Sequence, residues 1–157
     1  MLSRLEEKGF VVSRIKSGRI SDKLAALLYE DSEEQLSGMG TRMMESVGAD
    51  KAMELFGTQD AYMLGKQINA WNREYSSSDN VIAVVLEGRG ENVQEEVKRL
   101  VGKTDPVKAN KGTIRGDLGD DSILISNLER RTVRNLIHAS DPVRVETEIN
   151  LFEEHFF

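Results

Sequence analysis

Residues 135–141 read Asn-Leu-Ile-His-Ala-Ser-Asp, a short apolar run that ends in a histidine and is followed at once by helix-capping residues. We predict a strand over 133–137, because branched apolar residues stand there before a turn. Ser140 or Asp141 would cap a last helix, with Pro142 near its first position. His138 would then be held by a rigid strand end and open toward a cleft, where sites tend to form. By position alone, a structural role is the commoner one for such a histidine.

The nearest upstream feature is a single arginine between two glycines. Residues 112–117 read Gly-Thr-Ile-Arg-Gly-Asp, and glycines at both ends permit tight backbone turns around Arg115. A guanidinium presented in this way could bind phosphate through two parallel hydrogen bonds. The pattern alone is weak, because an ordinary turn also fits it. It lies in a long polar segment, 103–131, of the kind that is usually functional or disordered.

The rest of the chain alternates predicted strands and helices. Strands are expected over 10–15 and 81–86, and the second is an unbroken apolar run that favours a strand covered on both faces. Ser21 is a predicted N-cap of a helix that Tyr29 closes. Residues 33–75 are helical in character, and Gly102 is expected to end a further helix. This order indicates one α/β or α+β domain that spans residues 1–157.

The composition is that of an ordinary soluble protein. The chain has 157 residues, 39% of them hydrophobic, a net charge of −6 and no cysteine. Disulfides and thiolate metal sites are therefore excluded. No run approaches the ~20 apolar residues of a membrane span, and the first residues lack the order of a signal peptide, so a cytoplasmic protein is predicted. An acidic chain is also a poor non-specific binder of nucleic acid.

Four blocks in this order and spacing resemble the nucleoside diphosphate kinase family. They are residues 102–106 (Gly-Lys-Thr-Asp-Pro), 112–117, 135–141, and Glu146-x-Glu148-Ile149. Glu6 to Phe10, Leu27 to Tyr29 and Val81 to Gly88 also fit, so the resemblance covers nearly the whole chain. It is strongest from Val81 onward.

The resemblance implies an α+β, ferredoxin-like βαββαβ sandwich with an antiparallel sheet. The family begins with a strand that ends in Lys-Pro-Asp, and here Met1 falls inside the helix that follows it, so the first strand is expected to be missing. Residues 33–75 are expected to be a helical insertion. The family forms hexamers or tetramers, so a homo-oligomer is predicted.

The implied activity is transfer of the terminal phosphoryl group from a nucleoside triphosphate, carried with Mg²⁺, to a nucleoside diphosphate by a ping-pong mechanism through a phosphohistidine. His138 would be the nucleophile and Glu148 would fix its tautomer. Nucleotide contacts are expected from Tyr29, Lys98, Thr104, Arg115 and Asn135, with no metal ligands on the protein. Arg is usual in the family where Lys98 stands. The alternatives are a truncated, non-catalytic nucleotide-binding or assembly module of the same fold, and a ferredoxin-like nucleic-acid binder, which the acidic charge disfavours.

Overall fold

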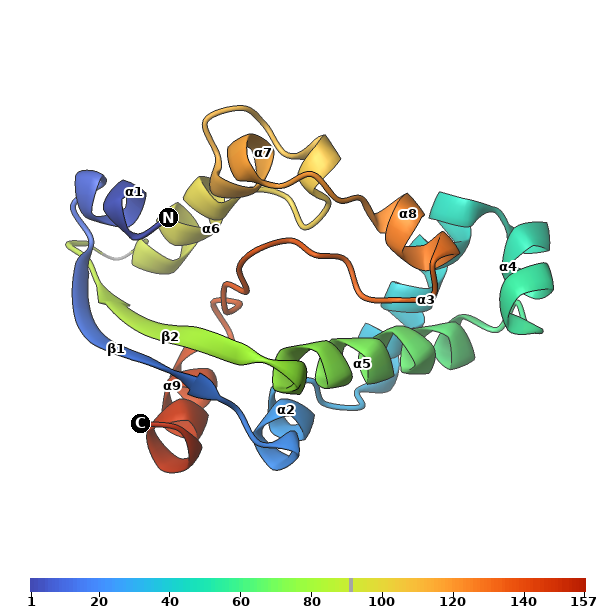
Figure 1. Ribbon diagram of the computed structural model, residues 1–157, viewed down its shortest axis with the longest axis horizontal. Coiled ribbons are helices and arrows are strands. Elements are labelled where there is room, and N and C mark those ends of the chain that lie inside the picture. Colours follow the sequence, from blue (N-terminus) through green and yellow to red (C-terminus); the bar gives the residue numbers. More distant parts are fainter. Residues whose placement is uncertain (91) are drawn as a thin grey trace.

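The computed structural model describes residues 1–90 and 92–157 and has an α+β architecture (Figure 1). The predicted fold class is confirmed by an antiparallel pair of strands among many helices. No helix in the described ranges is long and apolar enough to cross a membrane. In chain order the elements are α1 (Leu2–Glu7), β1 (Val11–Arg19), α2 (Asp22–Leu28), α3 (Glu33–Val47), α4 (Ala49–Phe56), α5 (Ala61–Ser78), β2 (Asn80–Glu87), α6 (Val93–Val101), the 3₁₀ helix η1 (Pro106–Lys108), α7 (Ile114–Leu118), α8 (Ile123–Leu128) and α9 (Val145–His155).

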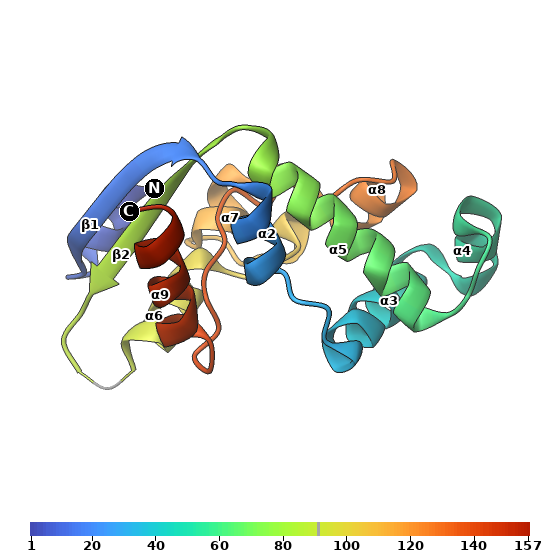
Figure 2. The same ribbon diagram turned by 90° about the horizontal axis from the view of Figure 1, so that it is seen from below.

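The two strands pair in antiparallel register from Val11 opposite Glu87 to Arg19 opposite Asn80, with an irregularity between Val12 and Arg14. Both strands were predicted, although β1 extends four residues beyond the predicted end at residue 15. The ribbon curves around the C-terminal helix (Figure 2). One face of it packs on α9 in a core of Ile20, Leu24, Ala25, Ala83 and Phe156.

The opposite face of the strand pair carries exposed apolar side chains. Ile15 on β1 is 50% exposed and Ile82 on β2 is 63% exposed. The prediction that β2 is covered on both faces is therefore wrong. Its apolar run does not alternate, but helix α9 covers only the side that includes Ala83, and on the other side Leu86 packs on a core with α1 and α6 while Ile82 stays exposed.

A second core lies where α1 and α6 meet the far end of the strand pair. Leu5, Phe10, Val97, Val101 and Ile114 are buried there. Gly102 ends α6 with φ +90°, as predicted, and a side chain at this position would collide with Thr113. This core fixes α6 and α7, and with them the segment that carries His138.

Helices α3, α4 and α5 form an arm that extends away from the strands (Figure 1). Helices α3 and α5 approach closely through two glycines, since a Cβ at Gly40 would lie 1.8 Å from the Ala61 carbonyl oxygen and one at Gly65 1.8 Å from that of Leu36. The arm has its own core of Met43, Ala52 and Leu64. Its helical character was predicted from the sequence.

The predicted strand over 133–137 is wrong. These residues form neither helix nor strand, and no other strand lies beside them among the described residues. A strand needs a partner for its hydrogen bonds, and here the carbonyls of Asn135 and Ile137 bond to Arg115 instead. The predicted cap at Ser140 or Asp141 is also wrong: a turn closed by Arg144 N–H on the Asp141 carbonyl (2.8 Å) precedes α9.

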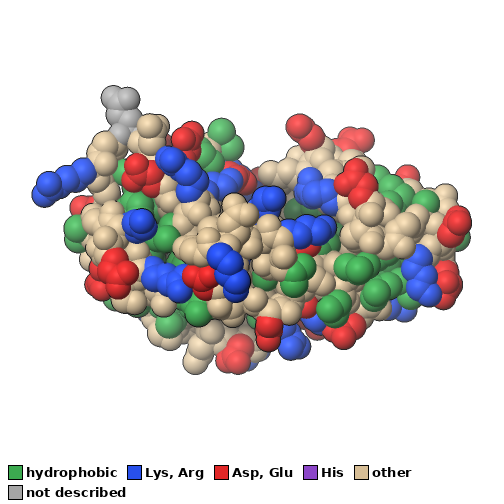
Figure 3. Space-filling model, turned by 90° about the horizontal axis from the view of Figure 1, so that it is seen from above, with side chains coloured by type: hydrophobic (Ala, Val, Ile, Leu, Met, Phe, Trp, Pro, Cys, Tyr) green, Lys and Arg blue, Asp and Glu red, His purple; other side chains and the backbone are tan. Residues whose placement is uncertain are grey.

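The two kinds of charge mix on the face shown in Figure 3. Blue basic and red acidic side chains alternate across it and form no continuous basic stripe there. Nucleic-acid surfaces usually show such a stripe. The expectation that nucleic acid is not a partner stays a prediction.

Candidate active site

His138 forms a close pair with Glu148. The His138 Nε2 atom lies 3.1 Å from Glu148 Oε2, and the two side chains are 55% and 6% exposed. Helix α9 presents the carboxylate from its first turn, whereas the histidine stands on the irregular segment before the helix. One edge of the imidazole is therefore held by the protein, and about half of the His138 side chain is open to solvent.

The environment of Glu148 favours its charged form. Burial, the largest influence, would raise the pKa of Glu148, but hydrogen bonds from His138 and Ser140 and the charges of His138 and Arg144 together lower it. Arg144 Nε lies 3.8 Å from the carboxylate on the same helix. An ionised carboxylate only accepts hydrogen bonds, so His138 Nε2 carries the proton of the pair.

Tyr29 borders the same pair from α2. Its ring lies 6.1 Å from the His138 ring, centroid to centroid, at an interplanar angle of 63°. Burial, and then the charge of Glu148, raise the pKa of Tyr29. The predicted proximity of Tyr29, His138 and Glu148 is thus present in the structure, although more than a hundred residues separate the tyrosine from the other two.

The backbone carbonyl of Tyr29 is held by helix α5. Asn69 Nδ2 donates to it over 3.0 Å and Arg73 Nε over 2.9 Å, and both side chains also contact the Asp31 carboxylate. Sequence reasoning missed both residues. Gly65, Asn69 and Arg73 recur every fourth residue and so form one stripe of the helix, which is a signal that could have indicated them.

Arg115 joins α7 to the segment before His138. Its side chain is 7% exposed, and it donates to the carbonyls of Gly102 (3.0 Å), Asn135 (3.1 Å) and Ile137 (2.5 Å). Burial lowers the pKa of Arg115. The guanidinium is therefore aimed at the backbone and not at open solvent, and its predicted contact with phosphate stays a prediction.

The residue between these two carbonyls has an unusual backbone. Leu136 has φ +71°, which is uncommon for a residue with a side chain, and the Ile137 N–H bonds to the Asn135 carbonyl over 2.9 Å across it. Such a conformation persists only when its surroundings impose it. The Arg115 hydrogen bonds on either side of Leu136 supply that constraint.

Lys98 reaches the His138 segment through an ion pair with Asp141. It also lines an open pocket of about 360 Å³ at the end of α6, together with the basic residues Arg99 and Lys103. Gly102, Asn110 and Thr113 complete the lining. Lys98 thus connects this basic pocket with the surroundings of His138, and its predicted contact with phosphate stays a prediction.

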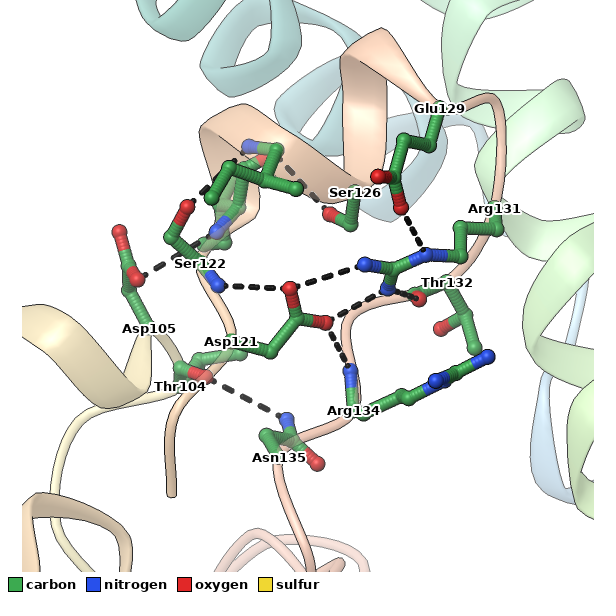
Figure 4. Close-up of polar contacts among 12 residues, drawn as sticks. Thr104, Asp105, Asp121, Ser122, Ser126, Glu129, Arg131, Thr132, Arg134 and Asn135 are labelled. Atoms are coloured by element: carbon green, nitrogen blue, oxygen red, sulfur yellow. Dashed lines mark hydrogen bonds and ion pairs between the residues drawn. The ribbon is translucent and has the colours of Figure 1, made fainter.

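Thr104 and Asn135 also lie together, because Asn135 Nδ2 is 3.4 Å from the Thr104 carbonyl. Figure 4 shows them at the edge of a polar network around Asp121. The Asp121 carboxylate accepts two bonds from Arg131 (2.6 and 3.0 Å) and one from the Arg134 N–H (2.8 Å). Hydrogen bonding from Arg131 strongly lowers the pKa of Asp121. The network holds the segment that leads to His138, and it was not predicted from the sequence.

Comparison with known proteins places this geometry in a family context. A family model described as "Nucleoside diphosphate kinase" matches residues 62–156. A nucleoside diphosphate kinase of Pyrobaculum aerophilum is 34% identical over 156 residues, which are 97% of this chain and 84% of the relative. One of Methanothermobacter thermautotrophicus is 33% identical over 93% of this chain and 86% of the relative.

Solved structures give the same result. The crystal structure of an NDP kinase from Pyrobaculum aerophilum superposes with a TM-score of 0.89 at 32% identity, over 98% of this chain and 86% of that one. A nucleoside-diphosphate kinase from Borrelia burgdorferi, a transition-state mimic with bound vanadate and ADP, superposes with a TM-score of 0.71 at 25% identity, over 96% and 74%.

Proposed function

The chain belongs to the nucleoside diphosphate kinase family of phosphotransferases, and from this premise we propose that it transfers the terminal phosphoryl group of a nucleoside triphosphate to a nucleoside diphosphate through a phosphorylated His138. The pair between His138 Nε2 and Glu148 carries the proposal. With the proton on Nε2, the neutral imidazole keeps an unshared electron pair on Nδ1, and this is the form that acts as a nucleophile.

In the first step, His138 Nδ1 attacks the terminal phosphorus in line with the bond to the leaving oxygen. The N–P bond forms, the P–O bond breaks, and a nucleoside diphosphate leaves with the electron pair on its terminal oxygen. The terminal oxygen of a second nucleoside diphosphate then attacks the same phosphorus and releases Nδ1. The proton stays on His138 Nε2 throughout, hydrogen-bonded to Glu148, and the carboxylate stabilises the positive charge that develops on the ring.

Lys98, Arg115, Thr104, Asn135 and Tyr29 are proposed as nucleotide contacts. Because phosphoryl transfer depends mainly on positioning and positive charge, a cation beside the histidine is the most important of them. Lys98 is paired with Asp141, three residues after His138, and a phosphate oxygen would replace this carboxylate. Thr104 would contribute a hydroxyl to the phosphates, Asn135 would contact the sugar, and Tyr29 would border the phosphate site.

We also propose that Mg²⁺ enters as part of the nucleotide substrate, where it neutralises phosphate charge. In the ranges 1–90 and 92–157, His, Asp and Glu side chains form no group of three or more that could hold a metal ion, which is compatible with a metal bound by the nucleotide.

A homo-oligomer, either hexamer or tetramer, is proposed as the assembled form. The exposed Ile15 and Ile82 on the open face of the strand pair support it, because apolar side chains on a sheet gain free energy when they are covered. A monomer in light scattering at micromolar concentration would contradict this assembly.

The proposed function is tested by labelling the protein with terminally radiolabelled ATP and Mg²⁺. The wild type and His155→Ala, which removes the other histidine of the chain, should take up label that is labile in acid and stable in alkali. His138→Ala should take up none. The labelled protein should lose its label on addition of an unlabelled nucleoside diphosphate.

Two results would contradict the proposal. Label that survives in His138→Ala would mean that another residue is the nucleophile. A folded wild type without any label would favour the non-catalytic, nucleotide-binding module of the same fold.

A further inference from the structure

Helix α5 holds the backbone of the residue that borders the candidate nucleophile. Tyr29 is the C-cap of α2, and its backbone (φ −110°, ψ 71°) has left the helical conformation. Carbonyls at a helix end have no partner within the helix. The Tyr29 carbonyl instead accepts hydrogen bonds from Asn69 and Arg73, forty and forty-four residues later in the chain.

Asn69 makes these contacts from a fully buried position. It is 1% exposed, and its Nδ2 atom faces the Tyr29 carbonyl (3.0 Å), the Glu30 carbonyl (3.5 Å) and Asp31 Oδ1 (3.0 Å). Its own Oδ1 atom, in contrast, has no hydrogen-bond partner among the described residues. A buried, unpaired acceptor destabilises a fold, whereas an apolar side chain of similar size would not. Packing alone therefore does not explain an asparagine at this position. The hydrogen bonds that its Nδ2 group donates do explain it.

Arg73 adds a fork to the same carbonyl. Its Nε and Nη2 atoms both point at the Tyr29 oxygen, and Nη2 also lies 3.1 Å from Asp31. The ion pair is partly exposed, and pairs of this kind contribute little to stability. The planar fork nevertheless restricts the position of the carbonyl in a way that a single donor cannot.

We propose that Asn69 and Arg73 are positioning residues of the phosphoryl-transfer site, which hold Tyr29 against His138 through the Tyr29 backbone. The inference rests on the function proposed above. The ring of Tyr29 lies 6.1 Å from that of His138, so a shift of its backbone moves the ring relative to the nucleophile. The arm is thereby linked to the site through its helix α5, by way of the Tyr29 backbone and, among the described residues, without a direct contact with His138. Small displacements of positioning groups can reduce a rate strongly.

The test compares Asn69→Ala, Arg73→Ala and Arg73→Lys with two matched controls on the exposed side of α5, Gln67→Ala and Lys66→Ala. We expect kcat to fall by about 5- to 10-fold in each alanine variant of the pair, which corresponds to the loss of one ordinary hydrogen bond. Arg73→Lys keeps the charge but loses the fork, so it should show part of the loss. The controls should match the wild type.

A second readout does not depend on activity. The chain has two histidines, and the ring of Tyr29 shifts the proton resonances of His138, while those of His155 serve as an internal reference. In folded Asn69→Ala and Arg73→Lys, the His138 resonances should move toward their positions in Tyr29→Leu. Unchanged His138 resonances in every variant would refute the inference even if the wild type is active. Shifted resonances in a chain without transferase activity would leave the positioning in place and refute the proposed function alone.

Discussion

Replacement of Glu148 by glutamine tests the most specific contact of the site. The variant keeps the size of the side chain but removes the charge that faces His138 Nε2 at 3.1 Å. A glutamine can present either its oxygen or its amino group to the ring, so the tautomer with Nδ1 unprotonated is no longer enforced. The expected effect is slower phosphorylation of the enzyme.

The size of the expected rate loss follows from the solvent exposure of Glu148 and His138. Hydrogen bonds to charged groups contribute about 1.5–3 kcal/mol, which corresponds to about a 10- to 150-fold change in rate. Glu148 is buried, but His138 is 55% exposed, so water competes for the ring. We therefore expect the lower end of this range, about tenfold.

The assay is a rapid acid-free quench of phosphoenzyme formation from labelled ATP at saturating nucleotide. Glu146→Gln is the matched control, because Glu146 lies exposed in the same first turn of α9 and its replacement removes the same charge. The control should retain the wild-type rate. A Glu148→Gln variant within twofold of the wild type would refute the role given to the carboxylate.

Three further predictions concern the arm, the polar network and the substrate metal. Gly38→Ala should raise the free energy of unfolding by about 0.5–1 kcal/mol, because the added Cβ would meet only a flexible side chain. Gly40→Ala should lower the free energy of unfolding by about 1–3 kcal/mol, because the added Cβ would collide with the Ala61 carbonyl. Thermal denaturation of both variants tests the pair. Asp121→Asn should cost about 2–3 kcal/mol in urea denaturation, less than a fully buried pair because Arg131 is 25% exposed. The pKa of Asp121 is lowered in the folded state, so its contribution to stability is complete above the ordinary aspartate pKa of 3.8 and is lost as the pH falls below it. Asp121→Asn should therefore lose less stability than the wild type on acidification. An equal loss in the two proteins would contradict this. Chelation of Mg²⁺ should abolish labelling from ATP without a change in thermal stability, and a fall in stability would indicate a metal bound by the protein itself.

Local patterns in the sequence predicted much of the fold. Ser21 accepts from the Leu24 N–H as an N-cap over 3.1 Å, and Gly102 ends α6 with positive φ, because both effects act within a few residues. The strand over 133–137 was predicted wrongly for the opposite reason. Whether an apolar run forms a strand depends on a partner that lies far away in the sequence, and here Arg115 provides the hydrogen bonds.

The central residues of the site could be predicted from the sequence, but the residues that hold them in place could not. His138, Glu148 and Tyr29 were identified through the family resemblance, and the structure brings them together. Asn69 and Arg73 act through the backbone of Tyr29, and backbone contacts leave little trace in residue types. The same holds for Arg115, whose burial cannot be read from the glycines beside it.

The three carbonyls bound by Arg115 also bear on the order in which the site assembles. They lie 13, 20 and 22 residues from it in the chain, so closing these loops costs little conformational entropy. Tyr29 must join His138 across 109 residues (138 minus 29), and contacts of such long range form late in folding because the chain loses more entropy. We therefore expect the histidine segment to take its bend before Tyr29 joins it.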